Sequence, residues 1–198
     1  MKPRSFKAAL DGLLLPLGFE RDARTWTRQV DGFRDIVDQQ VSSIAGTTVN
    51  VLSHDLAALA IMAEVTSPGH GIYGAMDPIR VPSRVSGLDT WYHSGGDGPA
   101  QLAEVLRVFG LPIFDQMRFL EHRARHMGRF SKRAEMNNRR LHLAITLHRM
   151  GKVEEARRVL SNTPANMKEK WTPIIDALRR RLCLREPDCG DVGNLLIP

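Results

Sequence analysis

The Asp31-Gly32 dipeptide constrains the fold more than any other feature, because it separates two runs of residues typical of β-strands. Phe19–Val30 lies before it and Phe33–Ser43 after it, and a two-residue Asp-Gly loop favours a tight hairpin between antiparallel strands. Gly46 marks a further turn, and Thr47–Ser53 again has the composition of a strand. The sequence therefore predicts a three-stranded antiparallel meander.

The segments on either side of the meander differ in how clearly they indicate structure. A helix is predicted before it, since Ser5 can act as N-cap and apolar residues recur at helical spacing up to Leu17. After it, Leu56–Val65 is nearly all Ala, Leu, Ile and Met, and so short a run fits either a buried strand or a short core helix. Ser67–Gly98 is rich in Gly, Pro, Ser and Asp, which predicts loop with a strand near Ile79–Val85.

Helical patterns fill the second half of the chain. One helix is predicted from Pro99 to Gly110, and the next continues from Pro112 with apolar residues on one face and basic residues on the opposite one. The basic face consists of Arg118, His122, Arg125, Arg129 and Lys132. A helix hairpin is predicted around Gly151, and a last helix from about Pro173 to Leu184.

These elements together predict an α+β fold, in which an N-terminal helix and an antiparallel sheet of three to five strands pack with a helical C-terminal half that includes a helix hairpin. We expect an α+β domain over residues 1–135, a helical hairpin extension over 136–186 and a flexible tail over 187–198. The extension is expected to pack on the α+β domain, because a few tens of residues alone bury little core.

Short motifs occur in a fixed order along most of the chain. They are Leu17–Arg21, Trp26–Arg28, Gln40–Ser42, Val49–Val51, Trp91-Tyr92, Leu111–Phe114 and the hairpin at Leu147–Ala156. In this order they resemble the bacterial family catalogued as domain of unknown function 4304. The resemblance implies a small domain of helices and antiparallel sheet in a bacterial protein, and it carries over no activity and no site residue.

The positive charge of the chain is concentrated in one segment. The formal net charge is +6, and Arg118–His142 contains eight Arg or Lys residues against two Glu residues. The rest of the chain is balanced, with twenty basic and twenty acidic residues. A local patch of this kind indicates a negatively charged partner more strongly than a diffuse excess does.

We therefore expect a non-enzymatic protein-interaction module, of the toxin-neutralising or scaffolding kind, that binds a protein with an acidic surface through the basic helix face. The alternative is sequence-independent binding of nucleic acid through the same face together with Arg139, Arg140 and Arg179–Arg181. Phe119 and Phe130 lie off the basic face, which disfavours the stacking of bases between its cations.

No cofactor, metal or catalytic residue is expected. His122 and His126 have the spacing of two metal ligands on a helix, but the arginines around them disfavour a divalent cation. His54, Asp55 and Ser42 or Ser43 have no spacing that requires them to meet. An enzyme site between the sheet and the Gly-rich loop would instead need a deep pocket lined by His54, His70 or His93.

Two further expectations concern a ligand and the compartment. The Trp91-Tyr92 pair is a candidate ligand contact, although such a pair more often anchors a loop against the core. Cys183 and Cys189 are expected to be free thiols, and no secretory signal or long apolar run is present. We therefore expect a cytoplasmic protein without a membrane-spanning segment.

Overall fold

The computed structural model describes residues 5–66, 79–81, 90–130, 137–162 and 168–184. They form two compact units, each built from separate stretches of the chain. The sheet unit contains the described residues up to Ala57 and those from 79 to Arg123, and the helical unit contains the described residues of 58–73 and those from Ala124 onward. The division differs from the expected one at residue 135, and the packing of the hairpin on the sheet stays a prediction.

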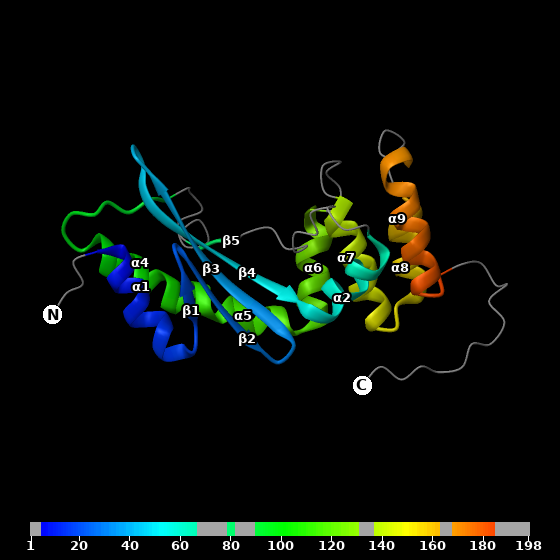
Figure 1. Ribbon diagram of the computed structural model, residues 1–198, viewed down its shortest axis with the longest axis horizontal. Coiled ribbons are helices and arrows are strands. Elements are labelled where there is room, and N and C mark those ends of the chain that lie inside the picture. Colours follow the sequence, from blue (N-terminus) through cyan, green and yellow to red (C-terminus); the bar gives the residue numbers. More distant parts are fainter. Residues whose placement is uncertain (1–4, 67–78, 82–89, 131–136, 163–167, 185–198) are drawn as a thin grey trace. The chain divides into compact units, whose positions relative to one another are not determined.

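The sheet has five strands in the order β1-β2-β3-β4-β5, and each strand is antiparallel to its neighbours (Figure 1). The strands are β1 Glu20–Asp22, β2 Thr25–Val30, β3 Phe33–Ser42, β4 Gly46–Asp55 and β5 Ile79–Arg80. The predicted α+β class and antiparallel meander are confirmed. The predicted first strand is in fact two strands, because the chain turns at Ala23, which has a φ of 51°.

The turns of the meander follow from local chemistry. Asp31 and Gly32 have φ values of 52° and 76°, which are the left-handed conformations that a two-residue hairpin loop needs. Gly46 has a φ of 103°, and a Cβ there would lie 3.0 Å from the carbonyl carbon of Tyr92 and closer still to its oxygen. Only glycine fits at this position, since Thr47 and Tyr92 exchange two backbone hydrogen bonds of 2.8 Å beside it.

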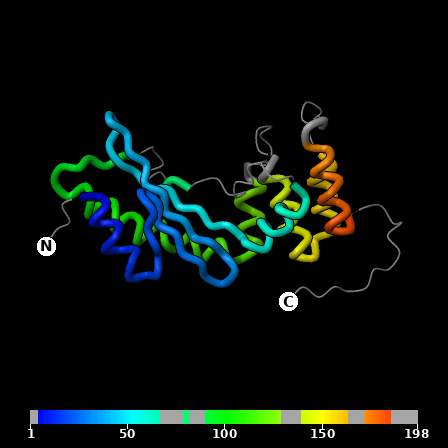
Figure 2. The backbone as a smooth tube through the Cα atoms, viewed as in Figure 1, coloured from blue at the N-terminus to red at the C-terminus, as the bar shows by residue number. Residues whose placement is uncertain are grey.

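Strands β3 and β4 are the longest, and their hairpin extends beyond β1 and β2 (Figure 2). Side chains alternate between the two faces of the sheet. The core face packs with helices of the same unit, and its core includes Leu10, Trp26, Val37, Val51, Leu106 and Phe114. The opposite face, here called the polar face, consists of Thr25, Thr27, Gln29, Arg34, Ile36, Asp38, Gln40, Thr48, Asn50, Leu52, His54 and Arg80.

The helices of the sheet unit are α1 Phe6–Leu14, the 3-10 turn η1 Leu15–Leu17, α4 Gly98–Val105, the π-helical segment η2 Leu106–Gly110 and α5 Leu111–Arg118. Helix α1 is confirmed, and the Ser5 hydroxyl accepts a hydrogen bond from the Ala8 amide at 3.2 Å. The predicted end of a helix at Gly110 is wrong, since η2 leads directly into α5. A wider π turn accommodates Pro112, which has no amide hydrogen for the preceding turn.

The remaining helices are α2 Leu56–Val65, α6 Leu120–Phe130, α7 Asn137–Arg149, α8 Val153–Ser161 and α9 Lys168–Arg181. The sequence of Leu56–Val65 is compatible with either a strand or a helix, and the structure has a helix there. The hairpin is formed by α7 and α8 and turns at Gly151, which has a φ of 74°. Helix α9 begins before the predicted Pro173, which lies inside it.

The predicted continuous helix after Pro112 is interrupted. Helix α5 ends at Arg118, Phe119 is extended with a ψ of 120°, and α6 begins at Leu120. Two carbonyl groups near the end of α5 accept hydrogen bonds from arginine side chains. Arg118 Nη1 donates to Phe114 O at 2.7 Å, and Arg123 Nε donates to Met117 O at 3.2 Å. These carbonyls therefore have partners without another turn of helix.

Candidate functional site at the free edge of strand β2

The predicted basic helix face is divided between two environments. Arg118 lies on α5, its side chain is only 16% exposed, and its Nη2 lies 2.9 Å from Asp35 Oδ2. His122 and Arg125 are exposed on α6, whereas the side chain of Arg129 and the whole of Lys132 lie outside the described residues. Arg118 and His122 belong to the sheet unit, and Arg125 belongs to the helical unit. Their shared role in binding stays a prediction.

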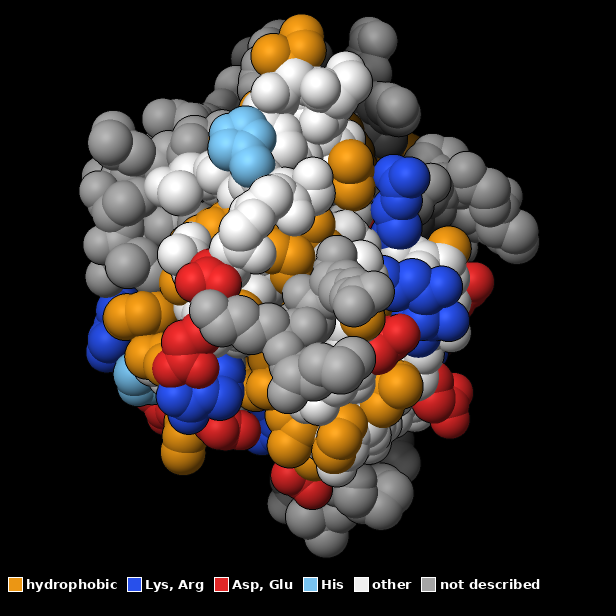
Figure 3. All heavy atoms as spheres, turned by 90° about the vertical axis from the view of Figure 1, so that its left-hand side faces the viewer, with side chains coloured by type: hydrophobic (Ala, Val, Ile, Leu, Met, Phe, Trp, Pro, Cys, Tyr) orange, Lys and Arg blue, Asp and Glu red, His pale blue; other side chains and the backbone are white. Residues whose placement is uncertain are grey.

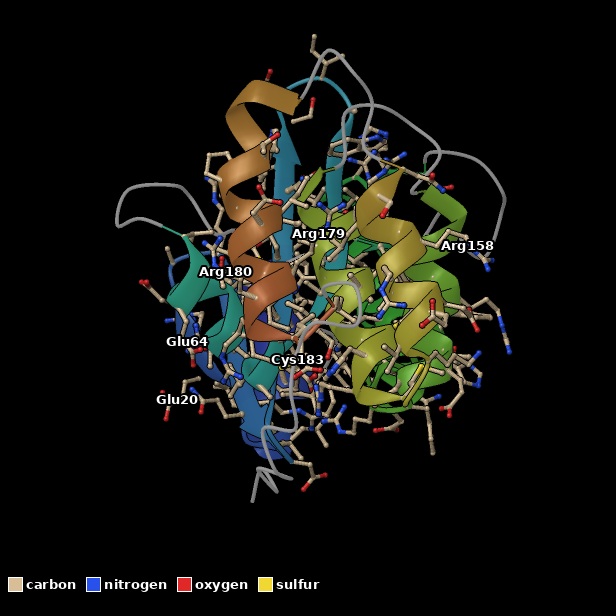
Figure 4. The ribbon with its side chains drawn as sticks, turned by 90° about the vertical axis from the view of Figure 1, so that its right-hand side faces the viewer. Glu20, Glu64, Arg158, Arg179, Arg180 and Cys183 are labelled. Atoms are coloured by element: carbon tan, nitrogen blue, oxygen red, sulfur yellow. The ribbon has the colours of Figure 1, made fainter. Side chains whose placement is uncertain are left out.

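Many of the other arginines in the helical unit have local partners. Arg179 bonds Asp176 at 3.3 Å and the carbonyl of Leu160, Arg181 pairs with Glu64, and Arg140 donates to the carbonyl of Asn162. Arg139 is buried, which lowers its pKa to about 10. Figure 4 shows Arg158 on α8 and Arg180 on α9, and both are exposed. These contacts leave fewer cations for nucleic acid than the sequence suggests.

The face of the molecule in Figure 3 mixes both charges. In Figure 3, Lys and Arg side chains lie among Asp, Glu and hydrophobic side chains on this face. A broad field of one sign is therefore not visible there, and any charge selectivity must come from a local arrangement. Such an arrangement lies around the carboxylate of Asp35.

Asp35 is the buried centre of a charged cluster in the sheet unit. Its Oδ2 accepts from Arg28 Nε at 3.0 Å and from Arg118 Nη2 at 2.9 Å, and its Oδ1 accepts from the Ser53 hydroxyl at 3.2 Å. Arg123 adds a second layer, because its Nη2 donates to Ser53 O at 3.0 Å. A carboxylate with no exposed surface is costly to bury unless several such partners surround it.

Arg28 connects this cluster to the surface. Its Nη1 donates to Leu17 O at 3.3 Å, and its guanidinium carbon lies 4.6 Å from the centre of the Phe19 ring. With the Asp35 bond, these contacts fix the guanidinium in position while its side chain remains 18% exposed. A guanidinium that is held in place and permanently charged is suited to bind a carboxylate or phosphate.

A pocket of about 530 Å³ lies beside Arg28. It is lined by Gly18, Glu20, Thr27, Arg28, Gln29 and Arg34. Strand β1 pairs with β2 only from Thr25 to Thr27, so in the described part of the chain no strand lies beside the edge of β2 beyond Thr27. The pocket therefore opens where the edge of the sheet becomes free.

The register of the meander shows how the backbone of Gln29 is oriented. Gln39 donates to the carbonyl of Arg24 at 2.9 Å, and bonds between antiparallel strands come from every second residue. The even-numbered residues of β2 therefore bond β3, and Gln29 directs its N–H and C=O toward the free edge. Among the described residues, no hydrogen bond is made to these two groups.

The charges lining the pocket are unequal. Arg28 and Arg34 contribute two guanidinium groups, and Glu20 contributes one exposed carboxylate. Arg34 lies opposite His54 in the register of β3 and β4. Burial first, and then the charges of Arg123 and Arg34, lower the pKa of His54, which therefore stays neutral at pH 7. Arg34 has no carboxylate partner in the described part of the chain.

The candidate ligand contact at Trp91 and Tyr92 lies at the other end of the sheet. Arg80 stacks over Trp91 at 5.0 Å and donates to Gln40 Oε1 at 2.7 Å. Tyr92 bonds Thr47, and burial raises the pKa of its hydroxyl. These contacts fit an anchor for the chain, and ligand contact stays a prediction.

The residues weighed for catalysis are not brought together. Ser42 and His54 lie at opposite ends of the β3–β4 ladder, and the Ser42 hydroxyl accepts from the amides of Ile44 and Ala45 in the turn. His93 is exposed, and His70 lies outside the described residues. Within the described ranges, no group of three or more His, Cys, Asp or Glu residues is placed to hold a metal ion. Cys183 is an exposed free thiol.

Sequence reasoning missed Arg28, Gln29 and Arg34, although the signal was present. Counting outward from Asp31-Gly32 places Gln29 opposite Arg34 and Arg28 opposite Asp35, as the structure does. The sequence does not show that β1 begins only at Glu20, which leaves the part of β2 beyond Thr27 without a described neighbouring strand.

Comparison with known proteins adds no assignment, and the resemblance drawn from the motifs stays a prediction. No helix in the described ranges is both long and apolar enough to cross a bilayer. No protein-family model, curated protein sequence or solved structure matches the chain.

Proposed function

We propose that the chain is a non-enzymatic interaction module that binds an acidic segment of a partner protein, of the toxin-neutralising or scaffolding kind. The observation that carries this proposal is the pocket at the free edge of β2, where Arg28 and Arg34 outnumber Glu20. The hydroxyl of Thr27 and the amide of Gln29 add hydrogen-bonding groups to the same lining. Together these groups recognise an anion through charge and hydrogen bonds.

A protein partner fits this pocket better than nucleic acid does. Strong binding to a nucleic-acid backbone needs several cations along a line of phosphates, and this pocket holds two beside a carboxylate. The N–H and C=O of Gln29, which bond no described residue, are groups that can pair with another polypeptide backbone. A test of this proposal must therefore distinguish binding of an acidic protein segment from sequence-independent binding of nucleic acid.

The direct test is fluorescence anisotropy of a labelled peptide with a Glu-Glu core, compared with labelled single-stranded DNA. We expect the peptide to bind and its affinity to fall as salt is added, because an exposed charge attraction is screened. Arg34→Glu should weaken peptide binding by about tenfold or more, since it reverses a charge in the pocket. Binding of DNA with no binding of the peptide would overturn the proposal.

Two matched variants make this test specific. Arg24→Glu makes the same change of charge on the exposed turn between β1 and β2, outside the pocket lining, and should leave binding nearly unchanged. Arg125→Glu makes it on α6, within the predicted basic face. Loss of binding in Arg125→Glu but not in Arg34→Glu would move the docking site to α6.

A further inference from the structure

We infer that the acidic segment binds in an extended conformation and pairs through its backbone with Gln29 of β2. This inference rests on the proposed function and specifies how the partner is held. Its starting point is the Gln29 N–H and C=O, which point away from β3 beyond the end of β1. An extended peptide placed there adds one residue pair to the sheet.

The side chains of such a peptide fit the charges on both sides of the edge. Arg34 lies opposite Gln29 on the polar face, whereas Arg28 lies opposite Asp35 on the core face. Successive side chains of an extended chain point to opposite faces. Two consecutive acidic residues therefore meet one arginine each, the first on the side of Arg34 and the second on the side of Arg28.

The two arginines play different parts in this arrangement. Arg28 is already oriented by Asp35, Leu17 and the Phe19 ring, so its guanidinium loses little freedom when a carboxylate binds. Arg34 is exposed and must be ordered on binding. The contact is short, because only Gln29 offers its backbone outward beyond Thr27 before the turn at Asp31. A weak, quickly reversible complex follows.

Glu20 opposes the partner from the end of β1. Its carboxylate is exposed and lines the same pocket as the two arginines. A like charge close to the docking groups disfavours an acidic peptide. Glu20→Gln removes that charge while keeping the size of the side chain, and it should tighten peptide binding by a few-fold.

The experiment uses the full chain and three forms of the labelled Glu-Glu peptide: the parent, one with an N-methyl group on the first Glu and one with it on the second. In an extended pairing, only one of the two amides faces Gln29. We expect one methylated peptide to bind about fivefold to tenfold more weakly, for the loss of one backbone hydrogen bond, and the other to match the parent.

A pair of protein variants tests the same backbone hydrogen bond by changing the protein instead of the peptide. Gln29→Pro removes the amide hydrogen that points to the free edge, and proline is tolerated where that hydrogen bonds no other strand. Gln29→Ala keeps the amide and removes only the side chain. We expect weaker binding in the proline variant than in the alanine variant.

The outcomes separate this inference from the proposed function. Equal binding of all three peptides would overturn the backbone pairing, while their binding would leave the proposed function standing. Equal weakening by both methyl groups would also overturn the pairing, because it would show no preferred side. If the parent peptide fails to bind, the pairing and the proposed function are both wrong.

Discussion

Arg118 Nη2 and Asp35 Oδ2 lie 2.9 Å apart although their residues are separated by 83 positions in the chain. This ion pair joins the end of α5 to the first part of β3. It also holds Arg118, the first residue of the predicted basic face, largely out of the solvent. A charge that the sequence assigns to an exposed face is in this case partly buried against an acid of the sheet.

Loss of the central carboxylate should destabilise the sheet unit strongly. Asp35→Ala leaves Arg28 and Arg118 without their shared acid, and removal of one partner from a buried ion pair costs about 3–5 kcal/mol. Urea unfolding followed by circular dichroism measures the change. Asp38→Ala, on the polar face of the same strand, is the control and should cost about 1 kcal/mol or less. Similar losses in both variants would contradict the central role of Asp35.

Reversal of charge should affect stability very unequally at two arginines of the predicted basic face. Arg118→Glu places a second acid beside buried Asp35 and should lower the free energy of unfolding by about 3 kcal/mol or more. Arg125→Glu changes an exposed side chain of α6 and should shift it by about 0.5 kcal/mol or less. Thermal unfolding of the two variants side by side provides the measurement. A stable Arg118→Glu protein would show that the ion pair contributes little.

The hydroxyl of Thr48 should be dispensable. Its Oγ1 is buried and makes no hydrogen bond with the described residues, and an unpaired buried hydroxyl destabilises a fold. Thr48→Val keeps the shape and should leave stability unchanged or raise it by about 1 kcal/mol. Ser53→Ala is the contrasting variant, because the Ser53 hydroxyl donates to Asp35, and it should cost about 1–3 kcal/mol. Destabilisation by Thr48→Val would indicate a partner for this hydroxyl.

Alanine should be harmful at one glycine and helpful at another. Gly46→Ala puts a Cβ into the backbone of Tyr92 at a φ of 103°, and it should cost about 2 kcal/mol or more. Gly12 lies inside α1 with nothing near the position of a Cβ, so Gly12→Ala should stabilise the protein by about 0.5–1 kcal/mol. Differential scanning calorimetry compares the two. Equal melting temperatures would mean that the close approach to Tyr92 is relaxed in solution.

Acidification should weaken the fold through histidines that are held neutral. Burial is the main cause that lowers the pKa of both His54 and His148 from the usual 6.5. The unfolded chain then takes up protons first, so stability is full above pH 6.5 and declines as the pH falls through the lower pKa values of the folded protein. Unfolding free energies measured across this range test the sign. His54→Gln should flatten the decline, and an unchanged slope would exclude His54 as a contributor.

The parts of the fold that local chemistry determines could be predicted from the sequence. Asp31-Gly32 determines a hairpin and with it the register that places Gln29 opposite Arg34, and Gly151 determines the turn between α7 and α8. These features depend on neighbouring residues and the left-handed φ values that their turns require.

The parts that long-range contacts determine could not be predicted. Phe119 interrupts a helix that the apolar spacing continues, because Arg118 and Arg123 reach back to the sheet and to the last carbonyls of α5. Periodicity carries no information about which arginine finds a distant acid. For the same reason the candidate site lies at Arg28 and Arg34, in a part of the chain with no excess of charge.

The division of the sheet unit between two stretches of the chain has a consequence for synthesis on the ribosome. The chain emerges from its N-terminus, so β1 to β4 leave the exit tunnel well before α4, η2 and α5. Val37 and Val51 are buried in the same core as Leu106 and Phe114, and until those arrive the nascent sheet exposes an apolar face. A chaperone that covers this face during translation should therefore raise the yield of folded protein.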